Sequence, residues 1–158
     1  MRTTVRSAIS LLFAGATLTA CTLEAPTGPA PVIETTTFAT SLGVNLSLMT
    51  KTATGLYYQD IAAGSGATAA KDLHLTVHYT GYLTNGSVFD TSVGKTAFGF
   101  VLGAGAVIAG WDEGLVGMRA GGTRKLVIPS QLAYGGGAVG SIPSNSILVF
   151  TVQLISIP

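Results

Sequence analysis

The sequence predicts an α+β domain in which an antiparallel, twisted β-sheet of about five strands wraps around one short α-helix. Three observations carry this prediction: a strictly alternating stretch at residues 73–82, an Asn-Gly pair soon after it, and one segment with helical spacing of apolar residues near residue 107. Alternation with a period of two is typical of a half-buried strand, whereas apolar residues three and four apart share one side of a helix.

The alternating stretch is expected to be a central strand. Its two faces separate completely, into Leu73, Leu75, Val77 and Tyr79 on one side and His74, Thr76, His78 and Thr80 on the other. Asn85-Gly86 favours a tight hairpin, so residues 87–92 should return beside this strand. Further strands are predicted at residues 97–103, 123–129 and 147–157.

One helix is predicted, starting near Val107. Ile108, Trp111, Leu115 and Met118 fall at spacings of three, four and three, which places them on one side of a helix that faces the sheet. Gly121 and Gly122 are suited to its end.

The N-terminal part divides into a signal and a tether. Residues 1–20 are predicted to be a secretory signal peptide, because Arg2 and Arg6 precede an apolar run over residues 8–18 that is shorter than the about 20 residues a spanning helix needs. LTAC at residues 18–21 resembles a bacterial lipobox, which implies a lipidated Cys21; ordinary cleavage after Ala20 is the alternative. Residues 21–50 are expected to be a flexible tether and residues 51–158 the domain, with docking of residues 38–50 left open.

Composition excludes several classes of function. Charged residues make up 9% of the chain, against about 25% in an average soluble protein, and the chain has eight basic and seven acidic residues. The basic residues are scattered, so no face is suited to nucleic acid. The sole cysteine excludes an internal disulfide.

Polar residues offer few routes to acid-base or metal chemistry, and no cofactor or metal is expected. Asp112 and Glu113 are interpreted as a solvated first turn of the helix rather than a catalytic pair, so Asp112→Ala should change little. His74 and His78 lie about 13 Å apart along a strand, too far for a shared metal. A triad of His78, Ser92 and Asp90 lacks a nucleophile elbow.

The glycine-rich stretch at residues 135–140 lacks the lysine of a phosphate-binding loop. It is interpreted as a flexible flap.

Aromatic residues are spread over almost every predicted element, and four blocks contain most of them. The blocks read VHYTGYLTNGSVFDTS (residues 77–92), VIAGWDEGLVGM (residues 107–118), LAYG (residues 132–135) and LVFTVQL (residues 148–154). In order and spacing they resemble the FKBP-type peptidyl-prolyl cis/trans isomerases. The resemblance covers residues 54–157 and implies the FKBP-like fold and catalysed rotation about Xaa-Pro bonds.

The resemblance also implies the site. Catalytic roles fall to Tyr79, Phe89, Asp90, Trp111, Tyr134 and Phe150, and substrate-binding roles to Phe98, Val107, Ile108 and Ile142. Trp111 would be the pocket floor, while the Tyr134 hydroxyl and the Ile108 N–H would bind peptide carbonyls. Ala106 stands where well-studied members often have a glutamate, and the flap is shorter than in cytosolic members.

The expected partners are proline-containing polypeptides, and macrolides such as tacrolimus or rapamycin. The protein is expected in the bacterial cell envelope, lipid-anchored on the extracytoplasmic side, either facing the periplasm or in the outer membrane. It is expected to be a monomer that assists the folding of extracytoplasmic proteins. The alternative is a non-catalytic module that binds proline peptides or acts as a chaperone with the same pocket. A structural or adhesion lipoprotein is a third reading, and it would have no pocket.

Overall fold

The computed structural model describes residues 29–158, so the expected signal peptide and Cys21 lie outside the described residues. The strands are β1 (Thr50–Lys51), β2 (Tyr57–Ala62), β3 (His74–Leu83), β4 (Val88–Thr91), β5 (Phe98–Val101), β6 (Thr123–Ile128) and β7 (Leu148–Ser156). One α-helix, α1 (Ala109–Gly114), and four 3-10 helices, η1 (Ile33–Thr35), η2 (Thr40–Leu42), η3 (Leu46–Leu48) and η4 (Ser130–Leu132), complete the described part. Within it, no helix combines the length and apolar character needed to cross a bilayer.

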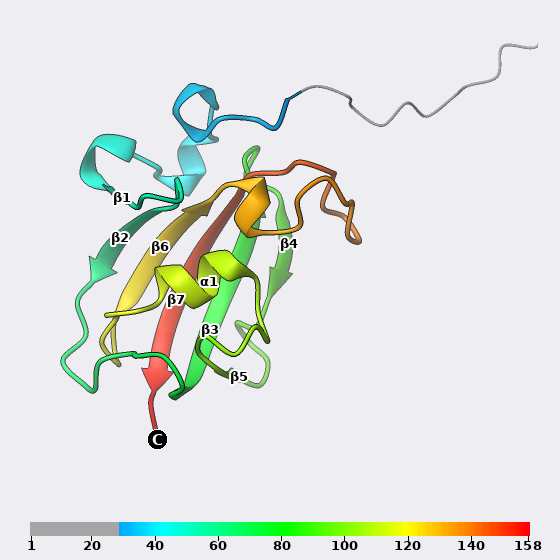
Figure 1. Ribbon diagram of the computed structural model, residues 1–158. Coiled ribbons are helices and arrows are strands. Elements are labelled where there is room, and N and C mark those ends of the chain that lie inside the picture. Colours follow the sequence, from blue (N-terminus) through cyan, green and yellow to red (C-terminus); the bar gives the residue numbers. More distant parts are fainter. Residues whose placement is uncertain (1–28) are drawn as a thin grey trace, which may run out of the picture.

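All strands belong to one antiparallel sheet in the order β1-β2-β6-β7-β3-β4, with β5 paired to β3 beside β4. The predicted α+β class is confirmed, although the sheet has seven strands rather than about five. The two longest strands, β3 and β7, pair from Thr76 to Leu83 and form its centre. The sheet twists around α1, which lies across its inner face (Figure 1).

The main core fills the space between α1 and the inner face of the sheet. Leu75 and Val77 of β3 are buried there, as the alternation predicted. Two glycines let α1 approach β6 closely: a Cβ on Gly110 would stand 2.4 Å from Ile128, and one on Gly114 would stand 2.8 Å from Leu126. Larger residues at these positions would push the helix, and Trp111 with it, away from the sheet.

The helix ends earlier than the spacing predicted. α1 stops at Gly114, although Leu115 and Met118 are buried as expected. The Arg124 guanidinium donates hydrogen bonds to the carbonyl oxygens of Gly114 at 2.8 Å and of Val116 at 3.0 Å, so these oxygens have partners without a further helical turn. Gly117 then adopts a φ of 78°, which turns the chain away.

The segment from Ile33 to Met49 packs against the outer face of the sheet and forms a second core. Ile33, Leu42 and Met49 are buried there against Val127 and Val149. Its three turns are 3-10 helices, and the docking of residues 38–50, which was left open, is seen in the packing of Leu42 and Met49. In Figure 1 the segment, in blue and cyan, lies at the upper end of the sheet, above β1 and β2. The packed unit therefore begins well before residue 51, and the expectation of a tether over residues 21–50 does not fit residues 33–49.

Five hydrogen bonds fasten this segment to the sheet and to the β3–β4 hairpin. The Ala39 N–H donates to the Thr84 carbonyl at 2.8 Å. Lys125 Nζ donates to the carbonyls of Leu42 and Gly43. The Glu34 carboxylate accepts from Lys51 and from the Tyr57 hydroxyl.

Candidate active site

Trp111 lies at the bottom of a cluster of aromatic rings between α1 and the sheet. Its side chain is buried. The centroid of its ring lies 5.1 Å from that of Tyr79 and 5.3 Å from that of Phe150, and the ring planes meet at 82° and 83°, respectively. Phe100 supports it at 5.7 Å. Edge-to-face pairs of this kind add about 0.5–1.5 kcal/mol each to the burial of the rings. The Trp111 ring is therefore held rigidly from several sides.

A β-bulge places the next two residues of the site. Along β3 the step from Gly81 to Tyr82 is one residue, whereas the opposing step from Asp90 to Val88 is two, so Phe89 is the extra residue. The bulge turns the Phe89 ring onto Phe150, with centroids 5.5 Å apart. Gly81 leaves the space for both rings, since a Cβ there would stand 2.5 Å from Phe89 and 2.8 Å from Phe150.

Asp90 is held at the pocket edge by two donors. The Tyr79 hydroxyl donates to Oδ2 at 2.5 Å, and the Thr91 N–H donates to Oδ1 at 2.8 Å. Burial, and then the hydrogen bond to Asp90, raises the pKa of Tyr79 to about 12. Tyr79 therefore remains a protonated donor across the physiological range.

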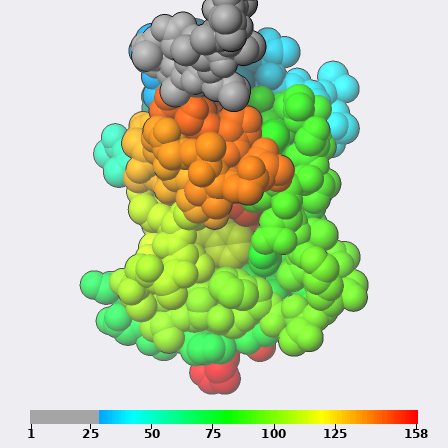
Figure 2. All heavy atoms as spheres, turned by 90° about the vertical axis from the view of Figure 1, so that its right-hand side faces the viewer, coloured from blue at the N-terminus to red at the C-terminus, as the bar shows by residue number. Residues whose placement is uncertain are grey.

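These rings enclose a pocket of about 190 Å³. Figure 2 faces its opening, a hollow between the flap in orange, β4 in green and the loop before α1 in yellow-green. The pocket is lined by Tyr79, Phe89, Asp90, Phe98, Ala106, Val107, Ile108, Trp111, Tyr134 and Phe150. Asp90 is the one charged residue in this lining.

The loop between β5 and α1 supplies Ala106, Val107 and Ile108, and Asp112 shapes it. Asp112 Oδ1 accepts from the Gly103 N–H at 2.7 Å and Oδ2 accepts from the Gly105 N–H at 3.1 Å. The interpretation of Asp112 as merely solvated is therefore wrong: its carboxylate fastens the pocket loop to the first turn of α1. Glu113 instead accepts from Thr54 at the surface.

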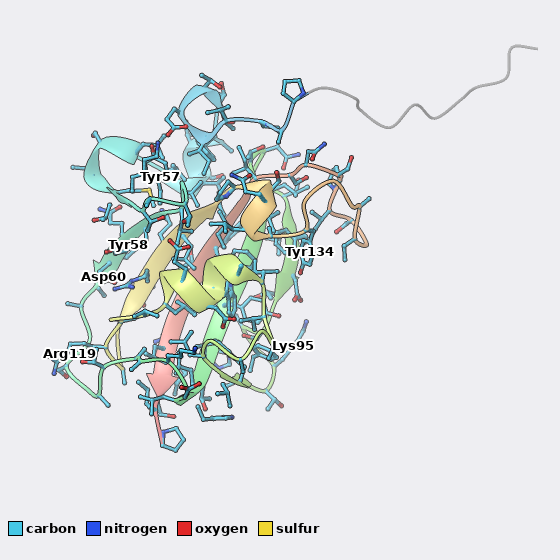
Figure 3. The ribbon with its side chains drawn as sticks, viewed as in Figure 1. Tyr57, Tyr58, Asp60, Lys95, Arg119 and Tyr134 are labelled. Atoms are coloured by element: carbon cyan, nitrogen blue, oxygen red, sulfur yellow. The ribbon has the colours of Figure 1, made fainter. Side chains whose placement is uncertain are left out.

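Two rim donors face the opening. The Tyr134 side chain, at the base of the flap, is 40% exposed, and in Figure 3 it lies on the same side of the molecule as Lys95. Among the hydrogen bonds of residues 29–158, neither the Tyr134 hydroxyl nor the Ile108 N–H has a protein partner, and the buried Trp111 Nε1–H is also unpaired.

The considered triad is not assembled. His78 Nδ1 lies 3.2 Å from the Ser92 hydroxyl, but that oxygen also accepts from the Tyr79 N–H at 3.0 Å, and Ser92 is buried. Asp90 is bound to Tyr79 rather than to His78. The contact between His78 and Ser92 supports the strand pairing and has no nucleophilic role.

Comparison with known proteins agrees with this geometry. The sequence profile of the FKBP-type peptidyl-prolyl cis-trans isomerases matches residues 66–155. The chain belongs to this family. An FK506-binding protein of Neisseria meningitidis serogroup B is 48% identical over 105 residues, which are 65% of this chain and 96% of that protein. FK506-binding protein 4 of Rhizopus delemar is 50% identical over 109 residues, and the match spans 68% of this chain but 28% of the fungal protein.

Solved FKBP structures share the fold. The crystal structure of AtFKBP13 has a TM-score of 0.66 at 36% identity and is matched over 70% of this chain and 98% of its own. FkpA from Escherichia coli has a TM-score of 0.64 at 42% identity, over 70% of this chain and 51% of its own.

Nine of the ten residues that the FKBP resemblance assigned to the site line the pocket, from Tyr79 in β3 to Phe150 in β7. Ile142 does not: it is buried beside the pocket and lines an adjacent hollow with Phe89, Asp90 and Tyr134. Ala106, noted in the sequence only as standing in place of a glutamate, also lines the pocket, and Phe100, to which no role was assigned, supports Trp111. Phe98 and Phe100 are two residues apart in β5, so their side chains lie on the same face of the strand, and this spacing was the available signal.

Proposed function

We propose that this FKBP-type chain catalyses cis/trans rotation about Xaa-Pro bonds in the aromatic pocket and so assists the folding of extracytoplasmic proteins. The observation that carries the proposal is the pocket itself: rigid aromatic walls, a single carboxylate already bound by two donors, and free donors at the rim. The geometry suits binding of a neutral ring and leaves no group poised for proton transfer.

The reaction needs no acid or base. Rotation about a peptide bond costs about 18–20 kcal/mol because resonance is lost, and an uncatalysed Xaa-Pro bond takes tens to hundreds of seconds to interconvert. The twisted amide has lost its charge separation and needs water less than the planar forms do. A dry apolar pocket therefore binds the twisted form better, and each 1.4 kcal/mol of this preference gives about tenfold in rate.

Each part of the pocket has a role in this proposal. Trp111 supports the proline ring, and Phe89, Phe98, Val107 and Phe150 surround it. The Ile108 N–H and the Tyr134 hydroxyl donate to carbonyls of the bound peptide and orient it. Asp90 fixes Tyr79 and sets the polarity of the pocket edge.

The test is a protease-coupled isomerisation assay of the full chain on Ala-Xaa-Pro-Phe peptides. We expect acceleration in the wild type and a loss of about tenfold or more in Phe89→Ala and Asp90→Ala with unchanged circular dichroism. The first variant removes a wall of the pocket, and the second releases Tyr79 from its hydrogen bond to Asp90. Glu113→Ala, which removes a surface carboxylate, is the matched control and should retain activity. A wild-type rate equal to the spontaneous one sinks the catalytic proposal.

The alternative is a module that binds proline peptides, or acts as a chaperone, without turnover. It predicts saturable quenching of the fluorescence of Trp111 by the same peptides without any acceleration. The two functions are thus separated by one set of peptides.

We further propose that the protein is a monomeric lipoprotein anchored through Cys21 on the extracytoplasmic side of a bacterial envelope membrane, and that its pocket also takes macrolides such as tacrolimus. Support for the anchor comes from the signal-like residues 1–20 and the lipobox-like LTAC, and support for the macrolide from the similarity to proteins named FK506-binding proteins. Labelled palmitate should enter the wild type and not Cys21→Ser. Equal labelling of both would contradict the anchor.

A further inference from the structure

Two hollows continue the pocket along the β3–β4 hairpin. The first, here the flap hollow, has a volume of about 210 Å³ and shares Phe89, Asp90 and Tyr134 with the pocket. Ile142 also lines it. The second, here the hairpin hollow, has a volume of about 390 Å³ and is lined by Pro143, which follows Ile142 in the chain, and by Leu83 of β3. The pocket and the flap hollow thus share three lining residues, and the adjacent residues Ile142 and Pro143 connect the lining of the flap hollow to that of the hairpin hollow.

The spacing along β3 shows how far apart these spaces lie. Asp90 at the pocket edge pairs with Gly81, and Leu83, which lines the hairpin hollow, is two residues further along the strand. Two strand residues span about 7 Å, and an extended peptide advances about 3.3 Å per residue. A chain leaving the pocket in this direction reaches the hairpin hollow after about two or three residues.

The walls of the hairpin hollow offer neutral hydrogen-bonding groups. Thr84, Asn85, Ser144 and Asn145 supply hydroxyl and amide groups, and none of its lining residues is charged. Such walls match the amide groups and uncharged side chains of a polypeptide. A charged side chain would lose hydration there without gaining an opposite charge.

Part of this wall comes from the N-terminal segment packed on the sheet. Pro31 and Thr36 line the hairpin hollow, and both lie outside residues 66–155, over which the family profile matches. The bond from the Ala39 N–H to the Thr84 carbonyl ties the segment to the opposite wall. The hollow therefore depends on a part of this chain outside the matched region.

We propose that the pocket, the flap hollow and the hairpin hollow form one groove that binds an unfolded, locally uncharged polypeptide for several residues on one side of the isomerised proline. The inference rests on the proposed function, because it extends the same substrate beyond the same pocket. Continuity with the pocket and the neutral walls identify the occupant as substrate chain.

The experiment compares kcat/KM of the full chain for Ala-Xaa-Pro-Phe with that for two octapeptides, which add four Ser, Thr or Ala residues before or after this core. The kcat/KM for one octapeptide should be about tenfold higher than for the tetrapeptide, which is the gain expected from one or two added hydrogen bonds. The kcat/KM for the other octapeptide should equal that for the tetrapeptide. Placing Lys or Glu in the favourable extension should remove the gain.

Ser144→Tyr, which fills the hairpin hollow, should bring the octapeptide-to-tetrapeptide ratio close to one. Ser65→Tyr, on the exposed loop between β2 and β3, is the control and should keep the wild-type ratio. A wild-type ratio near one for both octapeptides overturns the groove, as does a ratio that survives charged extensions or Ser144→Tyr. The charged extensions require no variant, so the test stands even where Ser144→Tyr does not fold.

The two proposals fail differently. No acceleration of the tetrapeptide overturns the catalytic function but not the groove, which is then judged by the affinities of the same peptides measured through Trp111 fluorescence. Equal affinities for the tetrapeptide and both octapeptides would overturn the groove as well.

Discussion

Replacing Asp112 with alanine should lower catalysis although Asp112 does not line the pocket. The change leaves the Gly103 and Gly105 N–H groups without their acceptor and frees the loop that carries Ala106, Val107 and Ile108. Hydrogen bonds to ionised groups contribute about 1.5–3 kcal/mol each. Because Asp112 is only partly buried, we take the lower end for the pair as a whole. If the free energy that holds the loop in place falls by about 1.5 kcal/mol and the transition state loses the same amount, kcat/KM falls about tenfold.

The measurement is protease-coupled isomerisation of a tetrapeptide by Asp112→Ala and Asp112→Asn, with thermal unfolding and Trp111 fluorescence in parallel. The amide retains one acceptor oxygen, so Asp112→Asn should keep part of the activity. Glu113→Ala, which removes the neighbouring carboxylate, should match the wild type. Wild-type kcat/KM in Asp112→Ala would refute the role of this carboxylate in fastening the loop.

Three further predictions concern the N-terminal segment and the pocket edge. The hydrogen bond from Lys51, and then that from Tyr57, lowers the pKa of Glu34 from 4.5 to about 2, so the Glu34 carboxylate contributes its full stabilisation above pH 4.5 and loses it as the pH falls towards 2. Glu34→Gln should therefore reduce the dependence of the unfolding temperature on pH between 4.5 and 2. The same dependence in Glu34→Gln and wild type would contradict the ion pair. A chain beginning at Thr50 should unfold at a clearly lower temperature than one beginning at Pro29, since it exposes apolar residues of β6 and β7 that each contribute about 1.5–3 kcal/mol when buried. Because the pKa of Tyr79 is raised to about 12, its stabilising hydrogen bond to Asp90 is intact below pH 10 and lost only as the pH rises towards 12. The phenolate absorbance of Tyr79 is measured as the difference between the wild type and Tyr79→Phe. A titration of this difference centred near pH 10 would refute the prediction.

The sheet was largely predictable because its signals are local, whereas the pocket lining was predictable from the resemblance of four sequence blocks to a known family. Alternation in β3 and the Asn-Gly turn depend on neighbouring residues, and the turn forms with Gly86 at a φ of 89°. The four sequence blocks supplied the positions of the aromatic rings, which local pattern alone would have assigned to an ordinary core.

The features that were missed depend on long-range contacts. The end of α1 is set by Arg124, which comes from β6 and also binds Asp60 of β2 at 2.7 and 3.0 Å. Asp60 lies on the edge of the molecule away from Tyr134 (Figure 3). No periodicity around Leu115 shows that a distant side chain takes the helical carbonyls.

The docked segment and the Asp112 contacts were missed for a related reason. Ile33, Leu42 and Met49 are far apart in a threonine-rich stretch, so they show no period, and their burial follows from the apolar outer face formed by Val127 and Val149. The adjacent Asp112 and Glu113 look alike in sequence, yet only Asp112 faces the glycine loop.

The most direct test of the central claim measures exchange between cis and trans proline signals in a peptide by nuclear magnetic resonance, with the full chain present at catalytic concentration. No protease is needed, so the rate reports rotation about the Xaa-Pro bond alone. The pocket account predicts exchange that rises in proportion to enzyme concentration and is strongly reduced in Phe89→Ala. Exchange that stays at the spontaneous rate at every enzyme concentration would contradict it.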